Sequence, residues 1–327
     1  MALSDMKVFN QYLKAATIET LTQDVEKFNA ASAGAIRLTT QGIDGDFLQE
    51  SFWAGLHSAQ RRVDRYASNG NQSATPLAQK QYDAVKVAGG FGPILWEPGQ
   101  LAWVQKSPEE ALEVISRNLS EAILSDQLNT AIAALVAAIS NQAAAVNDVS
   151  ATAGVDYIAI NGAHAKFGDA SARLVAQVMN GVTYHGLIGK NLANAQQLFQ
   201  AGGVTIVDIL GRAVIVTDAP ALYSAAVTDP AAPAKQRVLS LADGAAMVMD
   251  GSDLITNIET SNGKNRIETT MQADYTFGLA LKGYTWDTAN GGKSPTDAEL
   301  ATGSNWDLVA NSIKASAGVI TIGDASK

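Results

Sequence analysis

The sequence predicts an elongated α+β subunit, and three patterns carry that prediction. A helical repeat of apolar residues predicts a helix from Pro108 to about Val146, and after Pro108 no Gly or Pro occurs until Gly154. Apolar and polar residues alternate strictly from Ile267 to Leu281, and short apolar strands and helices lie between these two segments. The helix would be on the order of 55 Å long and the strand about 50 Å. We therefore expect a flat, extended molecule.

The composition limits what this chain of 327 residues does. With 47% hydrophobic residues it can bury a sizeable core, in two domains or one elaborated domain. The net charge of -9 argues against a protein that grips nucleic acid, because phosphate binding needs a concentrated surface of Lys and Arg. The sequence has no cysteine, which excludes disulfides, thiolate catalysis and cysteine metal sites.

Neither a secretory signal nor a membrane span is predicted. The first seven residues lack a basic region followed by an apolar run. The least charged stretch, Gln127 to Val146, contains too many polar groups for a good membrane span. These groups are Asn129, Thr130, Ser140, Asn141 and Gln142. We expect no membrane contact, and a reducing cytoplasm is the default compartment.

The N-terminal third is predicted to begin with a helix from Met1 to about Ala31, followed by an extended stretch from Ala33 to Asp46. Phe47 to Tyr66 reads as a second helix with three arginines near its end, Arg61, Arg62 and Arg65. Positive charge suits the C-terminal end of a helix dipole. Two interpretations of the arginines stay open, a solvated helix end and a contact with an acidic neighbouring subunit.

A long hairpin-like extension of the chain is predicted from Tyr66 to Val104. Ser68 to Lys80 is polar and typical of a loop, and Gly89–Pro93 and Glu97–Gly99 are typical of turns. An isolated hairpin cannot bury both of its faces, so this extension is expected to rest on another surface. Its apolar side chains Phe91, Ile94 and Trp96 need a partner.

The start of the long helix carries the clearest local signal. Ser107 is in position to cap it, Pro108 takes the first helical position, and Glu110 can close a capping box. The Ala-rich stretch Ala131 to Ala145 allows other backbone to pack closely. The helix is therefore expected to act as a strut on which other elements lean.

The remainder of the chain is predicted to be mixed. Helices are expected at Ala170–Met179 and Asn191–Ala201, and strands at Val204–Ile209, Ala213–Thr217, Arg237–Leu241 and Ala245–Met249. Ser261–Lys264 is most simply a hairpin tip, with a ligand loop as the minor alternative. The tail from Gly291 to Lys327 receives no assignment.

The sequence contains no recognisable motif for catalysis or for binding a cofactor. His57, His164 and His185 share no motif with one another or with a carboxylate, so we expect structural or surface roles. Gly189-Lys190 lacks the other parts of a phosphate-binding loop, and there is no dinucleotide fingerprint or G-x-S-x-G turn. The five tryptophans are spread along the chain as core or interface anchors. No catalytic, cofactor or metal residue is predicted.

Several stretches resemble phage coat proteins. They are Gly89–Pro93 with Trp96–Gly99, Ser107–Ala111 at the start of the long helix, Gly211–Leu222, and Asp274–Gly278. The order of parts is similar to that of the Hong Kong 97-type capsid fold, which tailed bacteriophages, herpesvirus capsid floors and bacterial encapsulin shells share. The chain thus resembles the major capsid (coat) proteins of tailed bacteriophages.

The resemblance implies five parts: an N-terminal arm at residues 1–46, a helix and extended loop at 47–104, a peripheral domain with the spine helix at 105–153, an axial domain at 154–254, and a return to the peripheral domain with a C-terminal tail at 255–327. In the family the extended loop lies over the adjacent subunit. We therefore expect inter-subunit contacts at Arg61, Arg62, Arg65, Phe91, Ile94 and Trp96.

The resemblance also implies partners. Hexamers and pentamers would close the icosahedral capsid of a virion around double-stranded DNA, without sequence-specific binding and without a cofactor. The arm is too short to hold a scaffolding domain, so a separate scaffolding protein is expected, with a portal and, as an additional candidate, a decoration protein. Assembly is expected in the host cytoplasm.

Two other functions remain as alternatives. An encapsulin-like compartment would share the fold but hold protein cargo, and neighbouring genes would distinguish it from a phage head. A hydrolase of unknown mechanism is the remote alternative, because no catalytic constellation is present.

Overall fold

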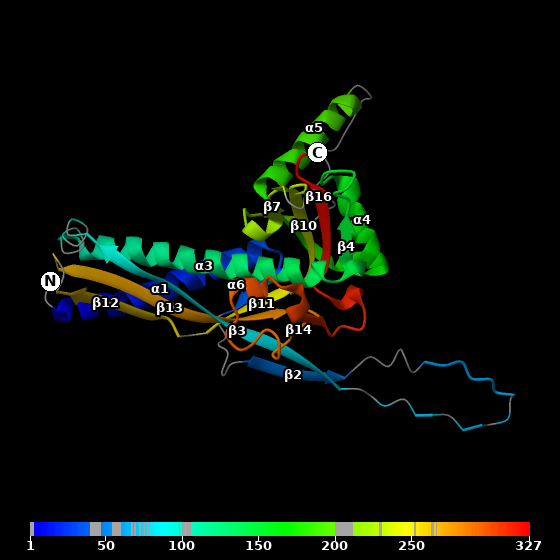
Figure 1. Cartoon of the computed structure of the whole chain (residues 1–327), viewed down its shortest axis with the longest axis horizontal. Helices are drawn as coiled ribbons and strands as arrows, with labels where there is room; N and C mark the ends of the chain where they lie inside the picture. Colours follow the sequence, from blue (N-terminus) through cyan, green and yellow to red (C-terminus); the bar gives the residue numbers. More distant parts are fainter. Residues whose placement is uncertain are drawn as a thin grey trace.

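A computed structural model describes most of the chain. It confirms the α+β class: helices and two mixed sheets form an elongated body with a compact domain at one end of a long arm (Figure 1). The described residues are 3–39, 47–53, 60–66, 68, 70–71, 73–74, 76, 79–97, 99, 102, 106–199, 212–228, 231–251, 253–262, 265 and 267–327.

The α-helices of the described part are α1 (Leu3–Ala31), α3 (Pro108–Ser140), α4 (Tyr157–Phe167), α5 (Gly181–Phe199) and α6 (Asp297–Leu300). The 3-10 helices are η2 (Ala143–Ala145), η3 (Gly168–Arg173), η4 (Pro220–Leu222), η5 (Gly303–Asn305) and η6 (Ile313–Ala315). α1 and the 33-residue α3 confirm the two longest predicted helices. α3 ends earlier than predicted, because the chain continues into η2 and then into a strand at Val146.

The start of α3 differs from the prediction in one respect. The side chain of Ser107 makes no capping hydrogen bond, so the predicted capping box is wrong. Pro108 does occupy the first turn, and Glu109 and Glu110 lie there beside the positive end of the helix dipole.

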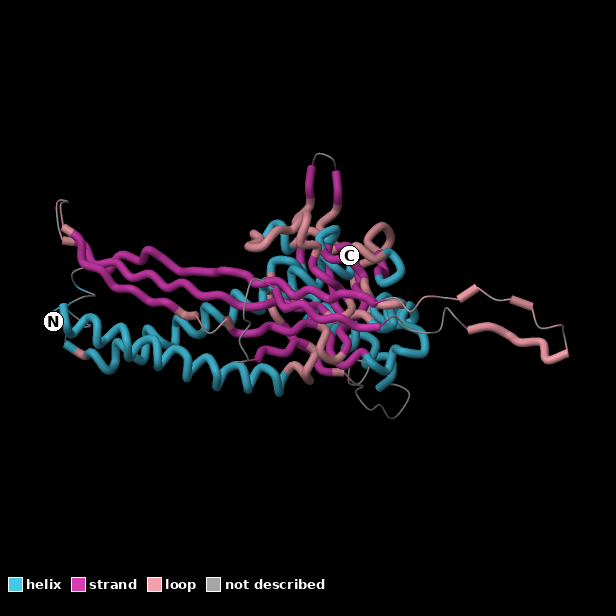
Figure 2. Tube along the Cα trace, turned by 90° about the horizontal axis from the view of Figure 1, so that it is seen from below, coloured by secondary structure: helices cyan, strands magenta, loops and turns pink. Residues whose placement is uncertain are grey.

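The first sheet supports the long arm. Its strands are β1 (Ile36–Thr39), β2 (Phe47–Trp53), β3 (Gln79–Trp96), β11 (Ala246–Asp250), β12 (Ile255–Ser261) and β13 (Glu268–Leu281). Antiparallel β3 pairs with one edge of β13, while β12 and β11 share the other edge. The 14-residue β13 confirms the long strand predicted from Ile267. Figure 2 shows the strands of this sheet running alongside the helices of the arm.

The core of the arm follows from the alternation in β13. Met271, Ala273, Tyr275, Phe277 and Leu279 are buried in the same core cluster as residues of α1 and α3. Full burial of one large apolar side chain contributes about 1.5–3 kcal/mol. The row of buried side chains on β13 therefore stabilises the packing of the sheet against α1 and α3.

Two predictions around the extended loop are wrong. Phe47–Trp53, predicted as the start of a helix, is β2, and residues 60–66 are not helical either. Gly89–Pro93, predicted as a turn, lies inside the continuous 18-residue β3. At Gly89 an added Cβ would lie 2.7 Å from the ring of Tyr275, so the glycine is required by close packing. The register between β3 and β13 shifts between Met271 and Ala273, which accommodates the irregular part of β3.

The second sheet forms the compact domain. It contains β4 (Val146–Asp148), β5 (Leu174–Met179), β6 (Ala213–Val216), β7 (Tyr223–Ser224), β10 (Lys235–Ala242) and β16 (Gly318–Asp324), in the order β4-β16-β10-β5-β6 with β7 beside β10. Two small ribbons are separate, β8 (Val227–Thr228) with β9 (Ala231–Ala232) and β14 (Tyr284–Trp286) with β15 (Trp306–Leu308). The C-terminal tail, unassigned from sequence, thus supplies the strand next to the centre.

The outcomes for the elements predicted between residues 170 and 250 are mixed. Strands β6, β10 and β11 confirm the predicted strands, and α5 contains most of the helix predicted from Asn191 but begins at Gly181. Ala170–Met179, predicted as a helix, is part of η3 followed by β5. The strand predicted at Val204–Ile209 and most of the loop predicted at Ser68 to Lys80 lie outside the described residues.

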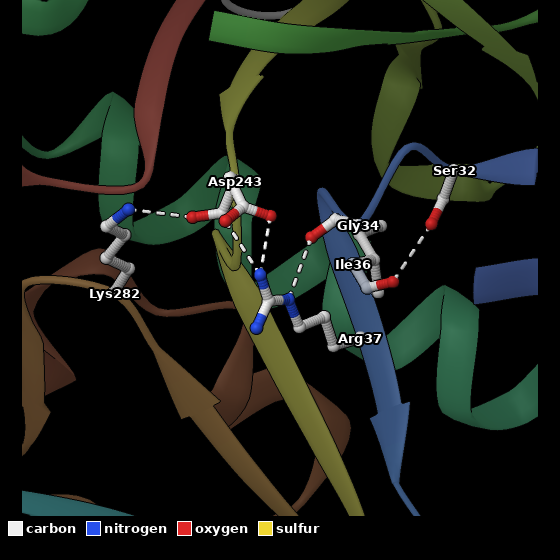
Figure 3. A network of polar contacts seen from close by, with 6 residues as sticks. All are labelled: Ser32, Gly34, Ile36, Arg37, Asp243 and Lys282. Carbon is white, nitrogen blue, oxygen red and sulfur yellow. Dashed lines mark hydrogen bonds and ion pairs between the residues drawn. The ribbon is translucent and has the colours of Figure 1, made fainter. Parts of the chain in front are cut away.

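The chain passes between the two sheets at the turn from β10 to β11, before the predicted end of the axial domain (Figure 3). There the Arg37 guanidinium contacts both carboxylate oxygens of Asp243 at 2.7 Å. Lys282 Nζ donates to the Asp243 carbonyl at 2.7 Å, and Arg37 Nε donates to Gly34 O at 3.4 Å. The ends of β1 and β13 are therefore tied to this turn.

Candidate assembly surface

The described polar clusters do not form a catalytic site. His164 is 5% exposed, and its Nε2 lies 2.9 Å from Ser240 Oγ, as in a base–nucleophile pair. Its other close partner is the Arg212 guanidinium, 3.2 Å from both ring nitrogens, where a catalytic base would have an orienting carboxylate. Burial and the Arg212 charge lower the pKa of His164 to about 4. The predicted structural role of His164 agrees with this geometry.

Other candidates for chemistry also have structural explanations. His185 is exposed on α5 and its ring contacts Tyr184 edge-to-face, whereas His57 lies outside the described residues. Lys190 lies within α5 and donates to Val155 O at 3.2 Å, which is not the position of a phosphate-binding lysine. Among the described residues, no group of His, Cys, Asp and Glu is arranged to hold a metal ion.

Helix α3 is long and apolar enough, by length and composition, to cross a membrane, with a mean hydropathy of 1.5 over its most apolar window. Yet 61% of that window is buried inside the fold. The helix packs against α1 and both sheets, so its apolar character is explained by its position in the core.

The most distinctive surface is a segment that its own chain leaves uncovered. We call Gln60–Tyr66 the projecting segment; it lies beyond the end of the body (Figure 1), and all of its residues are exposed. It contains the three predicted contact arginines, together with Val63 at 62% and Tyr66 at 100% exposure. Sequence reasoning missed these two apolar members as contact residues, although Val63 lies between the arginines and Tyr66 directly follows the last of them.

The stem of this extension is fixed to the body. β2 and β3 pair in antiparallel register up to Trp53 and Gln79. Lys80 Nζ donates to Val309 O at 2.5 Å, and the backbone amide of Asp83 donates to Thr285 Oγ1 at 2.8 Å. The projecting segment therefore leaves the body from an anchored stem.

The other predicted contact residues lie at the opposite end of β3. Ile94 is 49% exposed, and Phe91 is half-buried and stacks on Tyr275 with ring centroids 5.6 Å apart. Trp96 is only 9% exposed and belongs to the main core. The expectation that Trp96 needs an external partner is therefore wrong, because its own chain covers it. The fold brings Ile94 near exposed Leu95 but not near the arginines.

Comparison with known proteins gives one family match over nearly the whole chain. The model of the Gp13-like family, described as major capsid protein 13-like, matches residues 5–320. A search of curated protein sequences finds no match.

Solved capsid structures show weak similarity. The Helicobacter pylori bacteriophage KHP30 capsid has 9% identity and a TM-score of 0.47, covering 90% of this chain and 88% of that one. The cyanophage Pam1 capsid has 14% identity and a TM-score of 0.47, covering 77% and 87%. The capsid of Ralstonia phage GP4 has 11% identity and a TM-score of 0.45, covering 76% and 83%.

Proposed function

The chain belongs to the Gp13-like family of major capsid proteins, and from that premise we propose that its copies form the hexamers and pentamers of an icosahedral phage head around double-stranded DNA. It is a structural shell protein and not an enzyme. The single observation that carries this conclusion is the family match over residues 5–320. The match favours a capsid over the encapsulin-like alternative.

The shape of the subunit supports assembly. Tyr66 and Val63 stand exposed in the projecting segment, in which every residue is exposed. Specific interfaces centre on apolar and arginine side chains that a partner covers, and permanent ones bury about 2,000–5,000 Å² or more. The five-part division of the chain, with the extended loop as an assembly device, remains part of this proposal.

Two contact surfaces are proposed on each subunit. The first is the projecting segment with Arg61, Arg62 and Arg65, which would meet an acidic neighbour. The second is the far end of β3 with Phe91 and Ile94, where Leu95 and Ile267 are also exposed at 39% and 68%. Because these surfaces lie at opposite ends of the molecule (Figure 1), one subunit can contact different neighbours at once.

Further partners are proposed from the family. A separate scaffolding protein, a portal and a decoration protein would act during assembly in the host cytoplasm, without a membrane. The net charge of -9 suits a wall that encloses DNA without gripping it.

Negative-stain microscopy and sedimentation of the purified protein, with and without its scaffold, test the proposal. Closed shells or ring-shaped capsomers are expected. A compact, monodisperse monomer at every concentration in both conditions would contradict it. Portal and terminase genes beside the coding sequence would favour the phage head, and a cargo enzyme gene would favour the compartment.

A further inference from the structure

Cavities of very different size adjoin α3. A wide groove, made of two adjoining cavities of about 510 and 450 Å³, runs along its Ala-rich side. A much smaller cavity of about 20 Å³ lies where α1, α3, β1 and β11 meet. We call it the α1 cavity. A cavity needs about 10–15 Å³ to hold one water molecule, so the α1 cavity has room for one and not for a larger ligand.

Four polar residues line the α1 cavity, one on each of the four elements. They are Thr22 on α1, Thr39 on β1, Gln127 on α3 and Asp250 on β11. The other lining residues are aliphatic. A small polar ligand in this cavity would therefore contact all four elements at once.

The hydroxyl of Thr39 gives a second, independent observation. Its oxygen is buried and has no hydrogen-bond partner within the described part of the chain. An unpaired buried hydroxyl is unfavourable, so such groups almost always bond to protein or to ordered water. Because Thr39 lines a cavity large enough for a water molecule, water is the partner available to it.

The four groups match the bonding capacity of water. The Thr22 hydroxyl gives its hydrogen to Ile18 O at 2.9 Å, so toward the cavity it can only accept. A carboxylate such as that of Asp250 also accepts, whereas the Thr39 hydroxyl and the Gln127 amide nitrogen can donate. Gln127 is only 4% exposed, so bulk solvent offers its amide few partners. Two acceptors and two donors suit a water molecule, which has two hydrogens and two lone pairs.

We propose that the α1 cavity binds one ordered water molecule that bridges α1, β1, β11 and α3. The water accepts hydrogen bonds from Thr39 and Gln127 and donates to Thr22 and Asp250. Thr39 is the last residue of β1, so the bridge also fixes the point at which the chain leaves this strand. The site belongs to the folded subunit and does not depend on assembly into shells.

A high-resolution map of the crystallised subunit or of its particles tests the site directly. A single isolated peak is expected about 2.7–3.2 Å from the hydroxyl oxygen of Thr39, with a further contact to Asp250. An empty cavity in a map that resolves other buried waters, or a Thr39 hydroxyl bonded to protein, would overturn the proposal.

The variant Thr39→Val gives a test in which the sign decides. It should lower the unfolding midpoint by about 2 °C, because the water loses a partner. In a dry cavity the same change would remove an unpaired hydroxyl, and the midpoint would rise or stay the same.

The matched control is Thr321→Val. Thr321 is fully buried in β16, in the other sheet, and its hydroxyl also has no partner among the described residues. This change should not lower the midpoint. A midpoint that does not fall for Thr39→Val, or that falls equally in both variants, would count against the water.

A double-mutant cycle tests whether two side chains share the ligand. Gln127→Met keeps the approximate size of the side chain and removes its donor. If both side chains bond to one water, Thr39→Val and Gln127→Met together should lower the midpoint by less than the sum of their separate effects. Additive shifts would show that the two groups share no ligand, and the bridge would be wrong.

Salt identity separates water from a bound cation, since the carboxylate of Asp250 attracts both. Melting curves in sodium chloride, potassium chloride and N-methylglucamine chloride at equal ionic strength should coincide. A midpoint raised by sodium or potassium alone would mean that an ion occupies the α1 cavity, and the assignment of water would fall.

Discussion

Strand β16 and the projecting segment are of similar length and lie at opposite extremes of burial. Every residue of Gly318–Asp324 is buried, between β10 and β4. Every residue of Gln60–Tyr66 is exposed. The first segment is covered by its own chain and contributes to the free energy of folding. The second segment contributes almost nothing to the free energy of folding. Its residues can therefore differ without unfolding the subunit, and they can be selected for contacts with another subunit.

The packing of β16 shows how tightly the self-covered region is built. An added Cβ at Gly318, where φ is +155, would lie 2.1 Å from the Ser240 carbonyl oxygen. No comparable constraint acts on Gly70, which has no atom within 4 Å of an added Cβ. Substitutions should therefore separate into those that unfold the subunit and those that only prevent assembly.

The largest effect is expected from proline in the middle of α3. Ala134→Pro removes a helical hydrogen bond and clashes one turn back, at a cost of about 3 kcal/mol or more. Ala134 is fully buried, so overpacking adds about 1–3 kcal/mol. Urea unfolding should show the loss of a large part of the usual stability of about 5–15 kcal/mol. The control Val63→Pro should unfold like the parent. An unchanged Ala134→Pro midpoint would mean that α3 does not hold the subunit together.

Trp96→Ala should act on folding and not on association. Truncation of a buried aromatic residue costs about 3–5 kcal/mol, and Trp96 belongs to the main core. Thermal unfolding should report the loss at concentrations too low for assembly. Normal melting combined with lost particle yield would instead place Trp96 at an interface, among the residues that another subunit covers.

The buried His164 predicts a dependence of stability on pH. Its pKa is about 4 in the folded chain against 6.5 for the free side chain. The unfolded state therefore binds the proton first, and stability decreases as pH falls from about 6.5 to about 4, by about 3 kcal/mol in total. Urea titrations at several pH values should show a shallower decrease for His164→Gln. Parallel curves for parent and variant would show that His164 is not the group responsible.

The smallest effect is expected at the junction of the two sheets. The Arg37–Asp243 ion pair has about half of each side chain exposed, and such pairs contribute about 0–1 kcal/mol. Arg37→Ala and Asp243→Ala should each shift the unfolding midpoint slightly, and the double variant should cost little more than either single one. A loss well above this range would show that the junction, and not the core of α3, limits the stability of the subunit.

Local sequence patterns were sufficient to predict α3 and β13. Each is long, so its period repeats many times, and each has one face directed at the core that reveals the period. Local sequence patterns were insufficient to predict β2 and β5, which were both expected to be helical. The side of β3 beside Gln79–Val85 offers hydrogen bonds to Phe47–Trp53, and β10 does the same for Leu174–Met179. Pairing with a distant strand overrides weak helical spacing.

The candidate assembly surface also has one part that could be predicted from the sequence and one part that could not. The arginines of the projecting segment were identified from sequence because a cluster of like charges is visible locally, although residues 60–66 are not the helix end that was predicted. The groove along the Ala-rich side of α3 was not identified, because its lining comes from α3, η4, β10 and α6 with the start of η5, which are separate along the chain, and only the fold brings them together.

By itself the sequence determined the α+β class, the long helix and strand, and the resemblance to capsid proteins, since all of these depend on periods and motifs within continuous stretches. Only the tertiary structure decided that Trp96 is covered by its own chain, that the C-terminal tail enters the second sheet, and that Val63 and Tyr66 stand uncovered. Burial is a property of contacts between residues far apart in sequence, and a single stretch cannot specify what lies against it.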